Sequence, residues 1–245
     1  MLLAIDIGNT NIHNGIFKGR AFKKRFTLPT YGRKLENEYS KRLRPYLGKI
    51  NKVIVVSVVP PVLKDLETKL KAFLGQKILV VGRDVYSGVR NLYRRPSQVG
   101  QDRLINARAA YELYGGSAIV VDFGTAITLD VINSRKEYLG GVIAPGVELS
   151  LNALSERAFL LPKVSIKKPE AILGKETRES MRSGAVYGFS SLCDGVVLKL
   201  KRYCPKGLVI ATGGMSGLVG RFCKTVDRVD PDLTLKGLEL IGRRI

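Results

Sequence analysis

The first third of the chain alternates short apolar runs with turn residues and amphipathic stretches. An apolar strand and two further strand segments follow one another before residue 30, separated by short turns, and they predict an antiparallel meander. Strands and helices then alternate, and Pro61 marks the first turn of a helix. The expected elements are strands at 2–7, 12–17, 22–28, 53–57 and 78–81 and helices at 35–47 and 61–73.

A second series of elements begins after the pair Gly115-Gly116. Residues 83–101 are rich in turn formers and predict a long loop, which ends at a helix over 102–114. Beyond the glycine pair, the order of the opening elements repeats. The expected elements are strands at 118–121, 127–132, 138–143 and 208–211, and helices at 145–155, 178–203 and 235–242, with one more ending at Phe222. The repeat predicts an N-terminal lobe of residues 1–115 and a C-terminal lobe of residues 116–245.

Charge is the most unusual feature of the composition. The chain has 41 Lys and Arg against 21 Asp and Glu, which gives a formal net charge of +20. Such a charge favours anionic partners such as nucleotides or nucleic acid. The basic residues are spread along the chain, however, and this favours a solvated basic surface over a nucleic-acid site. A basic regulatory or nucleic-acid-binding protein therefore remains the alternative to an enzyme.

Cysteine usage and hydropathy indicate a cytoplasmic protein. The three cysteines, Cys193, Cys204 and Cys223, lack C-x-x-C spacing, so we expect reduced thiols packed in the interior. Apolar runs are too short to cross a membrane, and Asp6 interrupts the N-terminal run that a signal peptide would need. The single histidine, His13, excludes a metal centre built on several histidines.

Two turns of similar sequence follow the first strand of each half. They read Asp6-Ile7-Gly8-Asn9-Thr10 and Asp122-Phe123-Gly124-Thr125. A carboxylate and a glycine turn at the end of a buried strand gather backbone N–H groups and a negative charge, which suits phosphate and a divalent cation. Asp6 is a candidate for orienting Mg²⁺ through water. One such turn alone would be an ordinary hairpin, but its recurrence predicts a phosphotransferase that holds ATP between duplicated halves.

Two further motifs lie at strand or helix ends. Gly213 and Gly214 follow an apolar strand, where glycine allows close approach to a base or a ribose, although a simple turn explains them as well. Asp102, beside Arg103, opens a helix after the long loop. It is either a helix N-cap or a general base that accepts the proton of an attacking hydroxyl. The chain contains no Walker A, Rossmann or protein-kinase signature.

The motifs together resemble the type III pantothenate kinase family. In chain order they are D-I-G-N-T, V-G-Q-D-R-L-I-N-A, V-V-D-F-G-T-A, G-G-V-I-A-P-G, G-K-E-T-R-E-S-M-R-S-G and A-T-G-G. The resemblance runs from Asp6 to about Gly242 and is weakest over residues 18–50. It implies an α/β fold, the duplicated ribonuclease H-like, two-lobed fold of the acetate and sugar kinase/Hsp70/actin superfamily. It also implies a homodimer that uses ATP to phosphorylate pantothenate, the first step of coenzyme A biosynthesis.

The resemblance implies a role for each candidate residue. Asp102 would be the proton acceptor, and Asp122 would bind a monovalent cation, K⁺ or NH₄⁺. Pantothenate would be held by Tyr93, Gly100, Gln101, Asp102, Arg103 and Thr177. ATP would be held by Asp6, Ile7, Gly8, Asn9, Thr10, Asn11, Ile12, His13, Thr125, Gly213 and Gly214. Tyr93 and Thr177 also have ordinary roles open to them, as a packed loop aromatic and a helix cap.

The chain departs from the expected family pattern at two places. His13 stands where an apolar or small residue is expected, and Arg94-Arg95 is more basic than expected beside Tyr93. These departures bear on specificity more than on the class of reaction. A kinase of another small alcohol, such as a sugar, is separated from a pantothenate kinase here only by the resemblance.

Overall fold

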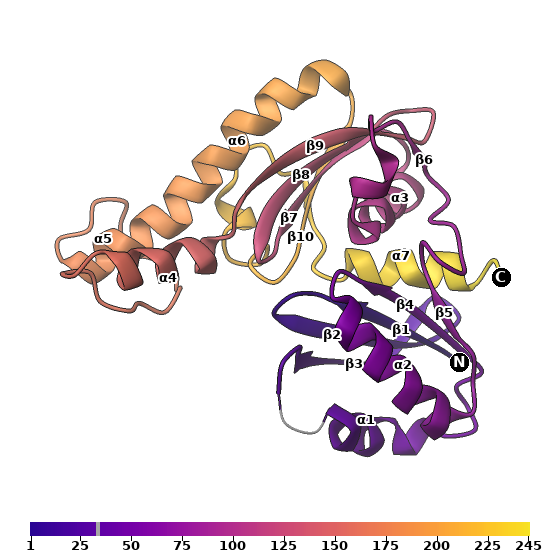
Figure 1. Ribbon diagram of the computed structural model, residues 1–245. Coiled ribbons are helices and arrows are strands. Elements are labelled where there is room, and N and C mark those ends of the chain that lie inside the picture. Colours follow the sequence, from indigo (N-terminus) through magenta and orange to yellow (C-terminus); the bar gives the residue numbers. More distant parts are fainter. Residues whose placement is uncertain (33–34) are drawn as a thin grey trace. The chain divides into compact units, whose positions relative to one another are not determined.

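A computed structural model describes residues 1–32 and 35–245 and divides into two units (Figure 1). Unit 1 contains residues 1–89, 95–109 and 234–245, and unit 2 contains residues 90–94 and 110–233. The last helix of the chain therefore belongs almost entirely to the unit that holds the N-terminus.

Unit 1 is built on a five-stranded sheet of order β3-β2-β1-β4-β5. The strands are β1 (Leu2–Ile7), β2 (Asn11–Lys18), β3 (Ala21–Pro29), β4 (Lys52–Ser57) and β5 (Ile78–Val80). β1, β2 and β3 form the antiparallel meander that the apolar runs predict, and β4 and β5 continue the sheet in parallel with β1. These five predicted strands are confirmed, and each end agrees with the prediction to within one residue.

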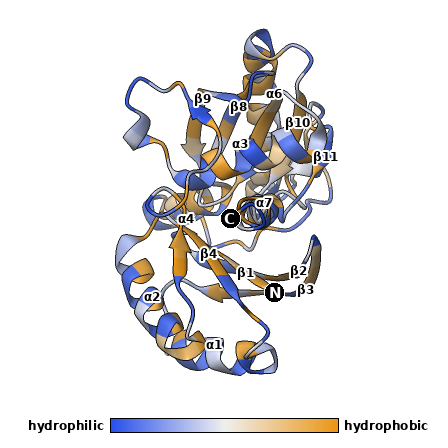
Figure 2. Cartoon of the chain, turned by 90° about the vertical axis from the view of Figure 1, so that its right-hand side faces the viewer, coloured by the Kyte–Doolittle hydropathy of each residue, from blue (hydrophilic) through white to orange (hydrophobic). Residues whose placement is uncertain are grey.

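Helices cover both faces of this sheet. α1 (Leu35–Leu43) and α2 (Pro60–Leu74) bury Leu43, Leu66 and Leu70 on one face, against alternate residues of β1 and β4. α7 (Leu233–Gly242) and the start of α3 (Gln101–Tyr114) bury Leu238 and Ile105 on the other. Consecutive residues of β1 and β4 are apolar and point to opposite faces of the sheet, so these strands are buried on both sides (Figure 2).

Unit 2 repeats the same sheet and adds one strand. Its order is β11-β10-β7-β8-β9-β6, in which β9, β8, β7, β10 and β11 correspond to β3, β2, β1, β4 and β5 of unit 1. The strands are β6 (Arg90–Asn91), β7 (Ala118–Phe123), β8 (Ala126–Ile132), β9 (Glu137–Pro145), β10 (Leu208–Thr212) and β11 (Arg228–Val229). The directions match as well, since β7, β8 and β9 are antiparallel neighbours and β10 runs parallel to β7. The predicted duplication is thus present in the topology.

One face of the second sheet is covered by α4 (Val147–Arg157) and α6 (Phe189–Leu200), and α5 (Thr177–Ser183) continues the helical layer beyond the sheet. A π-helical turn over Gly184–Gly188 joins α5 to α6, so the long helical stretch predicted over 178–203 is present with an irregular centre. The predicted helix at 145–155 starts two residues late, because Pro145 ends β9.

The α-helix predicted to end at Phe222 is wrong. Residues 214–219 form turns, and the helical part is a 3₁₀ turn over Gly220–Phe222. Four glycines between residues 213 and 220 account for the error, because each lowers the stability of an α-helix by about 1 kcal/mol relative to alanine. The predicted loop over 83–101 contains β6 and a 3₁₀ turn at Pro96–Gln98, which the sequence pattern does not reveal.

The three cysteines are free and buried in unit 2, as expected for packed thiols. In the part of the chain that the structure describes, no helix is both long and apolar enough to cross a membrane.

Candidate functional site

The first Asp-Gly turn connects β1 to β2 in unit 1. Gly8 N–H donates to the carbonyl of Asn11 at 3.0 Å, which closes the turn. Thr30, which is buried, holds the turn from outside, because its hydroxyl donates to the carbonyl of Gly8 at 2.6 Å. The turn is therefore a fixed structure directly after a buried strand. Thr30 is a supporting residue that sequence reasoning missed, since it lies 22 residues away along the chain.

Asp6, His13 and Thr27 form a row across three strands. Asp6 pairs with His13 in the register of β1 and β2, and His13 pairs with Thr27 in the register of β2 and β3. His13 Nδ1 lies 3.1 Å from Thr27 Oγ1. Side chains of paired residues point to the same face of a sheet, so the unexpected histidine is a neighbour of the Asp6 carboxylate.

Residues Gly100 to Arg103 form the first turn of α3, also in unit 1. The helix begins at Gln101, one residue before the predicted start, so Asp102 lies inside the first turn rather than before it. Its Oδ1 accepts the N–H of Arg103 at 2.9 Å. A β-carbon at Gly100 would come within 2.4 Å of the same oxygen. Glycine at position 100 thus leaves room for the Asp102 carboxylate. Because Asp102 is the second residue of α3, the predicted N-cap role is wrong, although its carboxylate accepts an N–H of the first turn.

The second Asp-Gly turn lies between β7 and β8 in unit 2, and Gly213 packs directly on it. A β-carbon at Gly213 would come within 2.3 Å of Asp122 Oδ1, and Met215 N–H donates to the carbonyl of Phe123 at 3.1 Å. Gly146, whose N–H donates to the carbonyl of Thr125 at 3.0 Å, packs on the other part of the turn. The structure therefore brings together Asp122, Thr125 and Gly213, which lie up to 91 residues apart in the sequence numbering.

Tyr93 lies next to β6, at the edge of the second sheet. Its N–H donates to Asn91 Oδ1 at 3.0 Å, and its ring centroid lies 6.5 Å from that of Tyr138. The predicted packed aromatic is thus observed, and packing does not exclude a contact with substrate, because Tyr93 is partly exposed.

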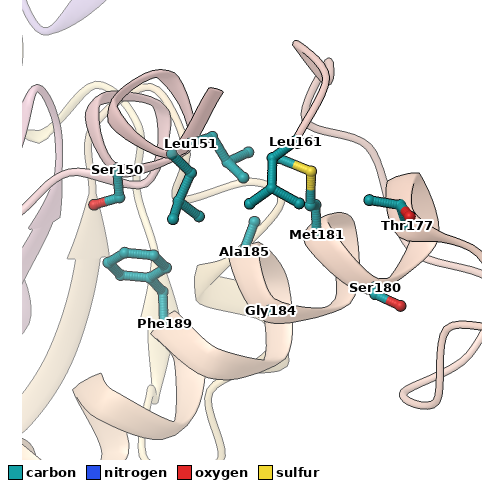
Figure 3. Close-up of a pocket in the computed structure, with 10 residues that line it drawn as sticks. Ser150, Leu151, Leu161, Thr177, Ser180, Met181, Gly184, Ala185 and Phe189 are labelled. Atoms are coloured by element: carbon teal, nitrogen blue, oxygen red, sulfur yellow. The ribbon is translucent and has the colours of Figure 1, made fainter. Parts of the chain in front are cut away.

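Thr177 lies elsewhere in unit 2, at a cavity of about 420 Å³ between α4 and the α5–α6 segment. Thr177 is the first residue of α5, and Glu176 occupies the N-cap position, so the predicted helix-cap role is wrong. In Figure 3, Thr177 lies beside Met181 at one end of this cavity, Leu161 lies next to Met181, and Leu151 lies towards the other end. The lining is mainly apolar, and Tyr93 does not belong to it.

The candidate residues thus fall into separate groups. Unit 1 carries the Asp6 turn and the Gly100–Arg103 turn, while unit 2 carries the Asp122–Gly213 cluster, Tyr93 and Thr177. Across the described residues, no group of three or more His, Cys, Asp or Glu side chains is arranged to hold a metal ion. A cation at either turn would therefore depend on one carboxylate, backbone carbonyls, water and phosphate oxygens, which is the usual situation for Mg²⁺ beside nucleotides.

The fold is similar to that of a protein of known structure. The chain is similar to a ROK hexokinase of Thermus thermophilus, with a TM-score of 0.53 and 13% identity, over 99% of this chain and 98% of that one. Two sheets of corresponding order, each with an Asp-Gly turn after an inner strand, thus give this chain the duplicated α/β fold that the hexokinase shares.

Sequence comparison narrows the class. Residues 2–199 match the family model of type III pantothenate kinase. The chain is 42% identical to the type III pantothenate kinase of Moorella thermoacetica and 42% identical to that of Halalkalibacterium halodurans, in each case over 100% of this chain and 99% of the relative. The chain belongs to the type III pantothenate kinase family.

Proposed function

We propose that this chain transfers the γ-phosphoryl group of ATP to the primary hydroxyl of pantothenate, giving 4′-phosphopantothenate and ADP. This is the first step of coenzyme A biosynthesis. The observation that carries the proposal is the family match over the full length of the curated relatives. The duplicated Asp-Gly turns supply the nucleotide chemistry that such a reaction requires.

Asp102 is the proposed proton acceptor. Phosphoryl transfer needs a carboxylate close to the attacking hydroxyl, and the N-terminal turn of α3 presents one. Its neighbour Arg103 is 9% exposed and suits the carboxylate of pantothenate, because a guanidinium binds a carboxylate through two parallel hydrogen bonds. Gly100, Gln101, Tyr93 and Thr177 complete the proposed acceptor site.

The ATP phosphates are proposed to lie on residues Asp6 to His13 and beside Thr125, with the base or ribose on Gly213 and Gly214. Asp6 lies near the end of the buried strand β1, and its carboxylate oxygens suit Mg²⁺ bound through water. When bound, Mg²⁺ offsets negative charge on the phosphate oxygens. His13 and the backbone of the Gly8 turn are the protein groups proposed to orient the phosphates.

Asp122 is the proposed ligand of a monovalent cation, K⁺ or NH₄⁺. Hard cations prefer oxygen ligands, and the Asp122 carboxylate lies beside the Gly124–Thr125 turn, whose carbonyl oxygens approach Gly146. The two halves, residues 1–115 and 116–245, are the proposed lobes that hold the nucleotide.

The proposed assembly is a homodimer. Large apolar side chains are exposed on α4 and on the segment that connects it to α5, with Phe159 fully exposed and Leu160 at 85%. The other members of this surface are Leu149, Leu154, Ile172 and Leu173. Exposed apolar surface of this kind marks a contact with another protein, and a second copy of this chain is the proposed occupant. The free cysteines support a cytoplasmic location.

The activity is tested by measuring ADP release with pantothenate and with a panel of sugars, each with K⁺, NH₄⁺ or Na⁺ as the monovalent cation. Turnover with pantothenate, and faster turnover with K⁺ or NH₄⁺ than with Na⁺, is expected. Turnover with sugars alone would overturn the acceptor assignment, and equal rates with all three cations would overturn the role of Asp122.

A further inference from the structure

Unit 2 contains a buried carboxylate, Asp130, that accepts a hydrogen bond from Tyr138. The ring of Tyr138 lies next to that of Tyr93, the tyrosine proposed to contact the acceptor substrate. Asp130 is on β8 and is 2% exposed, and Tyr138 on β9 is fully buried. The Tyr138 hydroxyl donates to Asp130 Oδ1 at 2.6 Å, and the Thr128 hydroxyl donates to Asp130 Oδ2 at 2.9 Å. Each carboxylate oxygen thus receives a hydroxyl donor. A buried polar group that loses its hydrogen-bond partner is destabilised, so these two hydrogen bonds hold the Tyr138 hydroxyl at Asp130.

Tyr138 in turn contacts the segment that carries Tyr93. The carbonyl of Tyr138 accepts the N–H of Leu92 at 2.9 Å, and the rings of Tyr138 and Tyr93 have centroids 6.5 Å apart at 47°. Such a tilted pair lies within the range of favourable aromatic contacts. Tyr93 therefore rests on the backbone and the ring of a residue whose own hydroxyl is held by Asp130.

Gly140 also packs against the ring of Tyr93. The register of β8 and β9 shifts between Val131 and Ile132, opposite this position, and Gly140 has φ +131°. A β-carbon at Gly140 would lie 3.6 Å from Cε2 of Tyr93, so the ring lies over the glycine. A bulge of this kind re-aims neighbouring side chains. The bulge and the Tyr138 ring together define where the Tyr93 ring lies.

The hydrogen-bonded residues Thr128 and Asp130 lie on the same face of the sheet as Asp122 of the second Asp-Gly turn. Thr128 is paired with Asp122 in the register of β7 and β8, and Thr128 donates to Asp130. Asp122, Thr128 and Asp130 therefore share one face of the sheet, with Tyr138 bonded to its far end. The face runs from the proposed cation ligand to the proposed acceptor tyrosine.

We infer that Asp130, acting through Tyr138, is a positioning residue for Tyr93 and so sets the affinity for the acceptor substrate. The inference rests on the proposed function, since it takes Tyr93 as a residue that contacts pantothenate. Neither Asp130 nor Tyr138 belongs to the family motif residues assigned to substrate or nucleotide. Their effect reaches the substrate through Tyr93 alone.

The first test is Tyr138→Phe, which removes one hydroxyl and keeps the ring. The KM for pantothenate is expected to rise roughly two- to tenfold, the effect of one hydrogen bond, while the KM for ATP and kcat stay within about twofold. Tyr114→Phe is the matched control, because its hydroxyl also donates to a buried carboxylate in the same unit, Asp230 Oδ2 at 2.8 Å. This control should leave both KM values unchanged. An equal rise in both KM values for Tyr138→Phe would overturn the inference.

Asp130→Asn is the conservative variant. The asparagine amide oxygen still accepts the Tyr138 hydroxyl, and the Thr128 hydroxyl can reverse to accept from the amide nitrogen, so the row is preserved. The KM for pantothenate should remain within about twofold of the wild type. An equal rise in the KM for pantothenate and in the KM for ATP would overturn the inference, because Asp130 would then not act through Tyr93.

A double substitution separates this inference from the proposed function. In a Tyr93→Ala background, Tyr138→Phe should raise the KM for pantothenate no further, because the group it positions is gone. An additive effect would mean that Tyr138 acts by another route and would overturn the inference while leaving Tyr93 in place. If Tyr93→Ala itself leaves the KM for pantothenate unchanged, the proposed role of Tyr93 fails, and the positioning role fails with it.

Discussion

The carboxylate of Asp122 lies against the backbone of Gly213. A β-carbon at position 213 would come within 2.3 Å of Asp122 Oδ1 and 2.7 Å of the carbonyl carbon of Phe123. Gly213 also has φ +88°, a conformation that side chains disfavour. Glycine is therefore required at this position twice over, by space and by backbone conformation.

Gly213→Ala should weaken ATP binding by at least about tenfold, because the new methyl group displaces the Asp122 turn, and should lower stability by about 1–2 kcal/mol through its φ alone. Calorimetric titration with ATP and urea unfolding measure the two effects. Gly217→Ala is the control, since a β-carbon there meets nothing within 4 Å. Unchanged ATP affinity in Gly213→Ala would remove this contact from the nucleotide site.

Asp102→Asn should lower kcat by about 10²- to 10⁴-fold, the usual contribution of a general base. The amide oxygen can still accept the N–H of Arg103, as Asp102 Oδ1 does at 2.9 Å, so the start of α3 is preserved. Stability and ATP affinity should therefore stay near those of the wild type. Single-turnover assays and thermal melts check this, with the exposed Asp65→Asn on α2 as control. Full turnover by Asp102→Asn would exclude Asp102 as the base.

Glu137 should make stability depend on pH. It is 5% exposed, and hydrogen bonds from Asn133 and then the nearby Arg135 and Arg90 lower its pKa below the usual value. Because the pKa is lower in the folded state, the stabilisation is present above the unfolded pKa of about 4.3 and is lost as pH falls through the folded pKa.

Glu137→Gln should consequently lower the melting temperature at neutral pH, and the difference from wild type should shrink as the solution is acidified past that lowered pKa. Thermal melts over a pH series measure this, with the exposed Glu156→Gln as control. A constant difference at every pH would mean that the charge of Glu137 contributes nothing.

Phe159→Glu should shift the assembly towards monomers. The side chain is fully exposed in the single chain, and placing a charge in an interface leaves it desolvated and unpaired. Sedimentation analysis should show a dimer dissociation constant raised by at least about tenfold, whereas Tyr31→Glu, which also alters an exposed aromatic residue, should leave it unchanged. A dimer as strong as the wild type would place the interface elsewhere.

Most strands of both sheets could be predicted because they contain several apolar residues and are bounded by turn formers. Two-residue strands such as Arg90–Asn91 and Arg228–Val229 have no periodicity to detect, and they form only because neighbouring strands offer an edge. The order of strand and helix predicts an α-helix that ends at Phe222, but the glycines of residues 213–222 disfavour it and a 3₁₀ turn forms instead.

The candidate site likewise contains some features that the sequence predicts and others that it does not. The Asp6 and Asp122 turns are visible in sequence because their residues are adjacent, whereas the hydrogen bonds from Thr30 to Gly8 and from Tyr138 to Asp130 join residues that are 22 and 8 positions apart. Such long-range contacts follow from register, and no single run of residues contains them. The contact between Asp122 and Gly213 belongs to the same kind.

The strand β6 breaks the symmetry of the duplication. Five strands of each unit correspond, and β6 is the extra one, added beside β9 with Tyr93 two residues beyond its end. An appended edge strand can change in sequence without disturbing the inherited sheet beneath it. The proposed contact of Tyr93 with the alcohol thus lies beside a strand that the duplication does not contain, so substitutions in β6 can change acceptor binding without altering the five strands that correspond in the two units.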